Sequence, residues 1–461
     1  MFDLGIRGGE VVTSSGRTRA AVYVRDGRIA QITRDSLPAR TNVDATGLLV
    51  MPGMVDAHVH FMDPGDPERE DFPTGTAAAA RAGVTTVVEH THAAPVITSS
   101  DLEDKRRHLA GRARVDFALA AHAWPDRLDE IAPVWRAGAA FVKAFTCNTH
   151  GLPGFDPAHL QRLLARASEC RAVCLVHCEE DSLVADAERA LRVAGRADPG
   201  IVPEWRNRAA ELTALAVTGL LARLTGARAV AAHVSHAQAL AVVGRERRAG
   251  ADLLAESCPQ YLSLLEDEVR EHGAFRKFTP PARARSPRDL DAMWKALARG
   301  DIEFISSDHA PATREQKARG SIWDVHFGLP GIDTTLPVLL DAAAAGRLSY
   351  ERIVEAYAER PARVYGLFPA KGALRPGADA DVVLVDPDER WTVRDADVLS
   401  KAGWSPFAGR TLTGRAVKTY LRGALVAEDG GLVAAPAMGR WLRGAGTLRI
   451  GPSRERQTSQ F

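Results

Sequence analysis

Short apolar runs alternate with helical segments through the middle of the chain, from about residue 51 to about residue 365. Eight runs end in polar residues: LLVMPGMVDAHVH, VTTVVEHTH, VDFALAAHA, AAFVKAFT, AVCLVHCEE, ARAVAAHVSH, ADLLAESC and IEFISSDHA. The segments between them, such as AHLQRLLARASEC and RNRAAELTALAVTGLLARLTG, are rich in Ala, Leu and Arg. Strands that alternate with helices form parallel sheets. Eight such units predict an α/β fold, the (β/α)8 TIM barrel.

The two ends of the chain show a different pattern, with short β-type runs between turn residues. In EVVTSSGRTRAAVYVRDGRIAQI, Val, Ile and Tyr cluster between Gly and Ser, and ADADVVLVD and VKTYLRGALVAEDGGLVAA repeat this style downstream. We expect residues 1–50 and 366–439 to form one small, discontinuous β-sandwich domain around a barrel of residues 51–365. Residues 440–461 turn polar and basic, which predicts a loosely held C-terminal tail.

The composition is that of an ordinary soluble globular protein, with 46% hydrophobic and 25% charged residues. A formal net charge of +1 gives no reason to expect nucleic acid or an acidic membrane as a partner. No apolar run approaches the roughly 20 residues of a membrane span, and MFDLGIRGGE does not resemble a secretory signal. The five cysteines, an odd number at irregular spacing, favour a reducing compartment and therefore a cytoplasmic protein.

Polar residues gather at one end of the predicted strands. In VDAHVHF, His58 and His60 are two positions apart, so on a strand their side chains point to the same side. The ends of four later runs carry Lys143, His177, His233 and Asp308. Barrel active sites lie at the carboxyl ends of the strands, and buried ionisable groups are costly unless they are paired or bind a metal. Four imidazoles and a carboxylate at one barrel mouth therefore predict a metal site, which zinc would suit.

Lys143 does not fit a metal site in its protonated form, because nearby cations repel it. Burial and neighbouring cations lower the pKa of a lysine and favour the neutral amine. A neutral amine can add carbon dioxide to form a carbamate, whose two oxygens could bridge metal ions about 3.5–4 Å apart. A lone lysine at a strand end is more often a salt-bridge or substrate-anchoring residue, and it is the surrounding histidines that favour the carbamate.

Taken together, these motifs resemble the amidohydrolase superfamily, and within it the cyclic amidohydrolases: hydantoinases (dihydropyrimidinases), allantoinases and dihydroorotases. The resemblance rests on VDAHVHF, FVKAF, VHCEE, AHVSHA, ESCPQYL, TPPAR and SSDHAP, and it extends from about residue 45 to about residue 425. It implies an enzyme that hydrolyses a small cyclic amide or ureide, as a homo-oligomer, either a tetramer or a dimer.

The resemblance also implies which side chains hold two divalent metal ions, which we expect to be zinc. The more buried ion would be bound by His58, His60 and Asp308. The second ion would be bound by His177 and His233. Carbamylated Lys143 would bridge both ions. A hydroxide between the metals would attack the ring carbonyl. Asp308 would act as general base and then as general acid toward the leaving nitrogen.

The substrate pocket is less clearly marked in the sequence. Dihydroorotase-like chains carry an arginine two residues after the second histidine, where this chain has Met62, and methionine cannot pair with a carboxylate. Hydantoinase-like chains use a tyrosine five residues after the lysine, where this chain has Asn148. Allantoinase-like chains match best in EDFPTGTAAAARAGVTTVV and WSPFAGRTLTG. Our candidates for substrate contacts are Met62, His92, Asn148, Thr279 and Leu329.

Other functions stay open as alternatives. One is a dihydroorotase-like enzyme or a hydrolase for a specialised cyclic amide. Another is a mononuclear deaminase or an acyclic amide hydrolase, although such a deaminase would not need Lys143. A third is a non-catalytic scaffold like the collapsin response mediator proteins, which resemble hydantoinases but have lost metal ligands, whereas this chain keeps all six positions.

Overall fold

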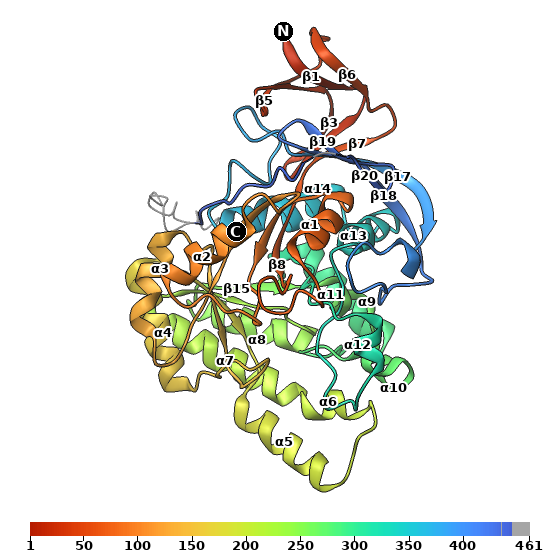
Figure 1. Cartoon of the computed structure of the whole chain (residues 1–461). Coiled ribbons are helices and arrows are strands. Elements are labelled where there is room, and N and C mark those ends of the chain that lie inside the picture. Colours follow the sequence, from red (N-terminus) through yellow and green to blue (C-terminus); the bar gives the residue numbers. More distant parts are fainter. Residues whose placement is uncertain (435, 445–461) are drawn as a thin grey trace, which may run out of the picture.

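Eight parallel strands form a barrel at the centre of the computed structural model, which describes residues 1–434 and 436–444 (Figure 1). In chain order they are β8 (Met54–Val59), β9 (Val84–Glu89), β10 (Asp116–Leu119) continued by β11 (Ala121–His122), β12 (Val142–Phe145), β13 (Val173–His177), β14 (Arg228–Ala231), β15 (Leu253–Ser257) and β16 (Phe304–Ile305). Neighbouring strands pair in parallel. Val59 and His309 close the ring by a parallel bridge. The predicted barrel is confirmed.

Helices follow the barrel strands and cover the outside of the barrel (Figure 1). They are α1 (Phe72–Arg81), α2 (Ser99–Leu109), α3 (Ile131–Ala137), α4 (Pro157–Cys170), α5 (Asp181–Val193), α6 (Ile201–Trp205), α7 (Arg208–Thr225), α8 (Ala237–Arg248), α9 (Pro259–Ser263), α10 (Glu268–His272), α11 (Pro287–Arg299), α12 (Arg314–Ala318), α13 (Thr335–Ala344), α14 (Tyr350–Val354) and α15 (Arg360–Val364). Local sequence sets their ends. Asp156 caps α4 by accepting from the His159 amide, with Pro157 in the first turn.

Strands from both chain ends form two sheets beside the barrel, at the top of Figure 1. The first half supplies β1 (Phe2–Arg7), β2 (Glu10–Thr13), β3 (Gly16–Arg19), β4 (Ala21–Arg25), β5 (Arg28–Thr33), β6 (Ala39–Asp44) and β7 (Leu49–Pro52). The second half supplies β17 (Val382–Thr392), β18 (Thr411–Leu421), β19 (Ala424–Glu428) and β20 (Gly431–Leu432). One sheet has the order β5-β4-β1-β6, and the other has the order β20-β19-β18-β17-β7-β2-β3.

The two chain ends meet where β17 pairs antiparallel with β7, with Val382 opposite Pro52. A separate apolar core, which includes Ile6, Val22 and Leu384, lies within this part of the fold. The prediction of a small β-sandwich domain built from both ends is confirmed. The boundaries at residues 50 and 366 stay a prediction, and the β7–β17 pairing supports them to within a few residues.

The first residues of the predicted tail differ from the expectation. Trp441 forms a parallel bridge with Phe117 on β10. The Phe117 amide donates to the Arg440 carbonyl at 2.9 Å, and the Leu442 amide donates to the Phe117 carbonyl at 2.7 Å. Trp441 and Leu442 also pack against the main hydrophobic core. Residues 440–444 are therefore held by the barrel, and the rest of the predicted tail, 445–461, lies outside the described residues.

The described residues contain no disulfide bond. None of their helices is long and apolar enough to cross a membrane. All five cysteines are free thiols. Burial raises the pKa of Cys147, Cys174 and Cys178 to about 12. These thiols are therefore protonated at neutral pH and act as small packing groups rather than as thiolate ligands.

Candidate metal centre

The six side chains predicted as metal ligands line one cavity at the carboxyl ends of the barrel strands. They are His58 on β8, His60 directly after it, Lys143 on β12, His177 at the end of β13, His233 after β14 and Asp308 after β16. His233 and Asp308 have positive φ values of 39° and 48°. Such backbone is sparsely populated for residues other than glycine and is often found at functional sites.

His58 and His60 each have one ring nitrogen fixed by a partner behind the cavity. Nδ1 of His58 lies 2.9 Å from Oε2 of Glu256, and Nδ1 of His60 lies 3.0 Å from the carbonyl oxygen of His90. Both partners are acceptors, so each Nδ1 carries the hydrogen. Burial lowers the pKa of His60 to about 4, which keeps this ring neutral at physiological pH. A neutral ring with its hydrogen on Nδ1 presents a lone pair at Nε2.

These Nε2 atoms face the same carboxylate oxygen. Nε2 of His58 lies 3.2 Å, and Nε2 of His60 lies 3.3 Å, from Oδ1 of Asp308. Two lone pairs and an anionic oxygen repel one another unless a cation lies among them. Ligand atoms that share a tetrahedral zinc ion at about 2.1 Å are about 3.4 Å apart. The spacing and the chemistry of this donor set therefore fit a divalent metal ion.

His177 and His233 form a second facing pair of ring nitrogens. Nδ1 of His177 lies 3.0 Å from Nε2 of His233. Nε2 of His177 donates to Oε2 of Glu179 at 2.9 Å, which leaves a lone pair on Nδ1. Burial lowers the pKa of both histidines, that of His233 well below its ordinary value. Two neutral imidazoles at this distance can share a hydrogen bond, and they can instead give their lone pairs to a second cation.

Lys143 lines the same cavity, and its side chain is almost fully buried. Burial lowers the pKa of its amine to about 8, although the nearby carboxylates of Glu256 and Asp308 act to raise it. At this pKa roughly a tenth of the amine is neutral at pH 7, far more than for an exposed lysine. The location and the lowered pKa both suit a lysine that reacts with carbon dioxide.

The pKa of Asp308 reflects opposing influences. Burial acts to raise it, but the imidazoles of His58 and His60, which attract the carboxylate and donate to it when they are protonated, hold it well below its usual range. Asp308 is therefore ionised at neutral pH. An ionised carboxylate in this position can bind a metal ion through one oxygen and accept a proton at the other.

Two buried carboxylates behind the ligands were not predicted from the sequence. Glu256 on β15 accepts from His58 and also from the His233 amide at 3.2 Å. Glu179 follows β13, and its carboxylate accepts from His177 and from the Thr279 hydroxyl at 2.6 Å. Carboxylates of this kind fix the orientation and tautomer of histidine ligands. The same-side spacing of His177 and Glu179 in VHCEE is the signal that could have revealed one of them.

Glu179 also belongs to a second group of potential ligand atoms, together with Cys147 and His177. The guanidinium of Arg206 already forms hydrogen bonds with this group. Its Nη1 donates to Cys147 Sγ and to Glu179 Oε2, both at 3.2 Å. Arg206 and Arg283 form buried ion pairs with the Glu179 carboxylate. A metal ion would have to displace a buried cation there, so this group is a charge-paired support for His177 and not a metal site.

Of the five predicted substrate contacts, His92 and Thr279 line the cavity. Met62, Asn148 and Leu329 are not among the residues that form its wall. Met62 has φ 56°, is fully buried, and its sulfur accepts from the Thr91 hydroxyl at 3.2 Å. The chain leaves the strand direction at this residue, so strand alternation no longer predicts where its side chain points.

Asn148 and Leu329 each have another location. The Asn148 side chain donates to Oδ2 of Asp181 at 2.9 Å and borders an open cleft next to the cavity. Leu329 is buried, and its carbonyl accepts from the Ala310 amide at 3.0 Å. Its neighbours Phe327 and Gly328 line the cavity in its place. A substrate role for Met62, Asn148 and Leu329 stays a prediction that this geometry does not favour.

The outer cavity wall contains aromatic rings, and the sequence did not single out two of them, Phe145 and His150. His150 stacks on His92, with ring centroids 4.3 Å apart and an interplanar angle of 12°. Phe145 and Phe327 lie beside this pair, with centroids 6.3 Å and 6.1 Å from that of His150. The cavity therefore has a charged inner end, where the ligands lie, and a largely aromatic outer end.

A (β/α)8 barrel whose mouth brings four histidines, a lysine and an aspartate together defines a metal-dependent enzyme of the α/β barrel class. Comparison with known proteins gives the family. The sequence profile of the amidohydrolase family matches residues 49–426. The chain belongs to the amidohydrolase family, and the predicted membership is confirmed.

Similar proteins match the chain over almost its whole length. It is 32% identical to an L-hydantoinase of Paenarthrobacter aurescens over 453 residues, covering 96% of this chain and 98% of the relative. It is 37% identical to an allantoinase of Rubrobacter xylanophilus over 453 residues, with the same coverage of 96% and 98%.

Solved structures show the same likeness. The structure of an L-hydantoinase (dihydropyrimidinase) from Arthrobacter aurescens has a TM-score of 0.92 and 32% identity, covering 96% of this chain and 100% of that one. A dihydropyrimidinase from Brevibacillus agri has a TM-score of 0.90 and 28% identity, covering 98% and 100%. The predicted resemblance to the hydantoinase and allantoinase group is confirmed.

Proposed function

We propose that the protein is a metal-dependent hydrolase that opens a cyclic amide or ureide ring, and specifically a hydantoin ring. The observation that carries this proposal is the donor set in which two histidine lone pairs face one oxygen of Asp308 at 3.2 Å and 3.3 Å. The similarity to an L-hydantoinase and an allantoinase supports the choice of ring. Allantoin is itself a hydantoin that carries a ureido group.

The residues favour two divalent ions, and we propose zinc. Imidazole nitrogens and a carboxylate oxygen are ligands that zinc accepts. Lys143, as a carbamate, would supply an oxygen to each ion, which its position in the cavity and its lowered pKa support. Bound metal ions would lower the pKa of water and polarise the ring carbonyl.

Asp308 would act as the general base and then as the general acid of the reaction. Its carboxylate is ionised and lines the cavity, so it can accept the proton of the attacking water. The same group would then donate that proton to the ring nitrogen as the C–N bond breaks. His58 and His60, each fixed at Nδ1, would hold the metal ion that keeps the Asp308 carboxylate in place during both transfers.

The outer wall supports a flat or polar substituent on the ring. The stacked His92 and His150 offer imidazole edges that can donate or accept hydrogen bonds, and Phe145 offers an apolar face. Among the described residues that line the cavity, the only side chains that could carry positive charge are Lys143 and the histidines. A ring carboxylate would therefore have no arginine to bind, which disfavours dihydroorotate.

The proposal is tested by a ring-opening assay with the zinc-loaded enzyme and four substrates: hydantoin, allantoin, dihydrouracil and dihydroorotate. We expect hydantoin or allantoin to be opened fastest, with dihydroorotate at least about tenfold slower, since one unpaired charge costs more than about 1.4 kcal/mol. Asp308→Asn is the matched control. An enzyme with two bound metals that opens none of these rings would contradict the proposal and leave the alternative of a hydrolase for a specialised cyclic amide.

We further propose that the protein is a cytoplasmic homo-oligomer, a dimer or a tetramer. Leu220 and Leu224 are 40% and 61% exposed and lie one turn apart on α7. Large apolar residues that share an exposed helix face favour contact with a second copy. Light scattering of the purified protein tests this, and a monomer at micromolar concentration would contradict it.

A further inference from the structure

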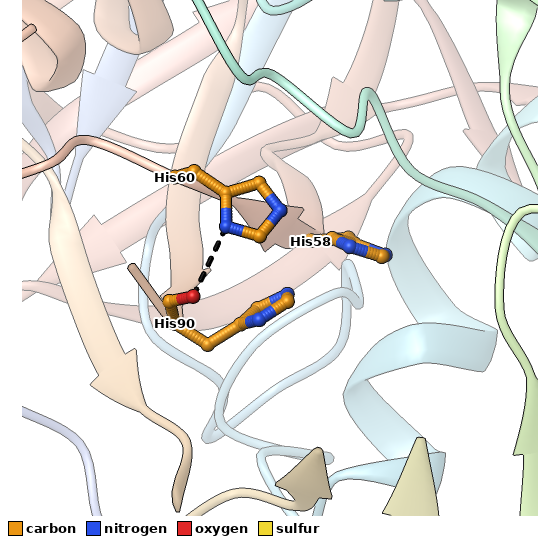
Figure 2. A group of neighbouring side chains, drawn as sticks. All are labelled: His58, His60 and His90. Atoms are coloured by element: carbon orange, nitrogen blue, oxygen red, sulfur yellow. Dashed lines mark hydrogen bonds between the residues drawn. The ribbon is translucent and has the colours of Figure 1, made fainter. Parts of the chain in front are cut away.

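His90 lies against two of the ligands, and the reaction described above gives its side chain no part. It follows β9, and its ring centroid is 4.5 Å from that of His58 and 4.3 Å from that of His60 (Figure 2). Its residue is 1% exposed. Neither of its ring nitrogens has a hydrogen-bond partner among the described residues. Because buried polar atoms are almost always satisfied, this ring points to a ligand that the protein atoms do not supply.

The three rings converge. One potential ligand atom from each of His58, His60 and His90 can be chosen so that all lie within 4.8 Å of one another. Figure 2 shows the His90 ring next to His58, while its backbone oxygen accepts from Nδ1 of His60. Nδ1 of His58 is fixed by Glu256. The two ring nitrogens of His90 have no partner among the described residues, and Nε2 of His58 and Nε2 of His60 both face Oδ1 of Asp308.

Three neutral imidazoles are a sufficient protein ligand set for one zinc ion, with water in the remaining position. We propose that His58, His60 and His90 form a three-histidine site that holds one divalent ion while Lys143 is a free amine. This inference rests on the proposed metal centre, and it adds a state in which the carbamate is absent. Without the bridging anion, the other facing pair offers only two nitrogens, His177 and His233, and would bind its ion weakly.

The proposal sets an order of assembly. The first ion binds the three histidines, and Lys143 then becomes a carbamate. In that step a bond forms between Nζ of Lys143 and the carbon of carbon dioxide, and the amine releases a proton to solvent. The carbamate oxygens would then complete both sites: the first ion, already beside Asp308, would exchange His90 for a carbamate oxygen, and His177 and His233 would hold the second ion. His90 is released in the final state.

Metal content measures this directly, without any assay of activity. Lys143→Ala cannot form the carbamate, so after zinc loading and dialysis it should retain about one zinc per subunit. Adding His90→Phe should lower that content at least about fivefold. Adding His122→Phe is the matched control, because His122 is also buried and neither of its ring nitrogens has a partner among the described residues. That second double variant should keep about one zinc.

Each outcome decides the proposal. It is overturned if Lys143→Ala binds no zinc, or if the His90 and His122 double variants retain the same amount. His90→Gln replaces His90→Phe if the larger ring prevents folding, as judged by circular dichroism. The unmutated enzyme gives a second measurement: stripped of metal and reloaded without carbon dioxide it should bind one zinc, and two after bicarbonate is added. The ring-opening assay of the fully loaded enzyme tests the proposed function separately.

Discussion

A neutral imidazole donates one hydrogen bond and accepts one, and this asymmetry determines how the ligand histidines act. His58 and His177 donate to the carboxylates of Glu256 and Glu179, and His60 donates to a backbone carbonyl. Each lone pair is thereby directed into the cavity. The partners behind the cavity therefore contribute, as much as the predicted ligands do, to a barrel mouth that can bind cations.

At the residue scale, Lys143 is the most informative position to change. Lys143→Ala should lower ring opening at least about a hundredfold, because it would remove the carbamate oxygens that we propose complete both metal sites. Short-chain carboxylic acids such as acetate or propionate should restore part of the rate by occupying the vacated space. The measurement is initial rate against acid concentration, with Lys295→Ala, an exposed helix position, as the control. A rate that no acid restores would contradict the carbamate.

The meeting of the six predicted ligand side chains in one cavity could be predicted, because strand ends in a barrel meet at one mouth and a strand's alternation fixes which side chains point there. Glu256 could not be predicted from the same rule, because its partner is almost two hundred positions away, on another strand. The substrate role predicted for Met62 stays a prediction, and its positive φ shows why strand alternation does not predict where its side chain points. The pattern of a sequence predicts which side chains of one strand or helix share a face. It does not predict which residues of different elements contact one another.

At the scale of elements, Asp56 joins three parts of the site. It lies on β8, two residues before His58, and it is fully buried. One carboxylate oxygen accepts from the Ser307 amide at 3.0 Å, and the other accepts from the Tyr357 hydroxyl at 2.8 Å. Ser307 directly precedes Asp308. The first strand, the loop after the last strand and the helical segment around Tyr357 are therefore held together at the base of the metal centre.

Asp56→Ala should lower the free energy of unfolding by about 2–4 kcal/mol, because it leaves a buried amide and a buried hydroxyl without acceptors. Thermal or urea unfolding of the zinc-free protein measures the change. Asp104→Ala is the control, since Asp104 forms an exposed ion pair with Arg107, and surface pairs contribute less than about 1 kcal/mol. Equal stability of the two variants would show that Asp56 does not hold these elements together.

The C-terminal segment shows the limit of prediction for elements. Residues 440–444 are too few to show a period, and their polar and basic neighbours suggest a tail. In the structure, Trp441 and Leu442 pack on the core beside β10. The strands and helices of the barrel could be predicted because many residues repeat the same hydrophobic pattern. The single bridge between Trp441 and Phe117 depends on the barrel surface against which the segment packs, and no local pattern predicts it.

At the scale of the whole molecule, the barrel brings distant parts of the sequence to one point. His58 and Asp308 are 250 positions apart in the chain, yet Nε2 and Oδ1 of these residues are 3.2 Å apart. The β-sandwich is built from both chain ends and leaves the carboxyl ends of the barrel strands free for the cavity. The division into barrel and sandwich could be predicted from the sequence, whereas the cavity shape depends on loops without a repeating pattern.

The most direct test of the account is a zinc titration of the metal-free enzyme in bicarbonate, with the rate of hydantoin or allantoin ring opening and the bound zinc per subunit measured on the same samples. The account predicts that the rate rises to its maximum as bound zinc approaches two per subunit. A full rate with one zinc or none, or no ring opening with two zinc ions bound, would contradict it.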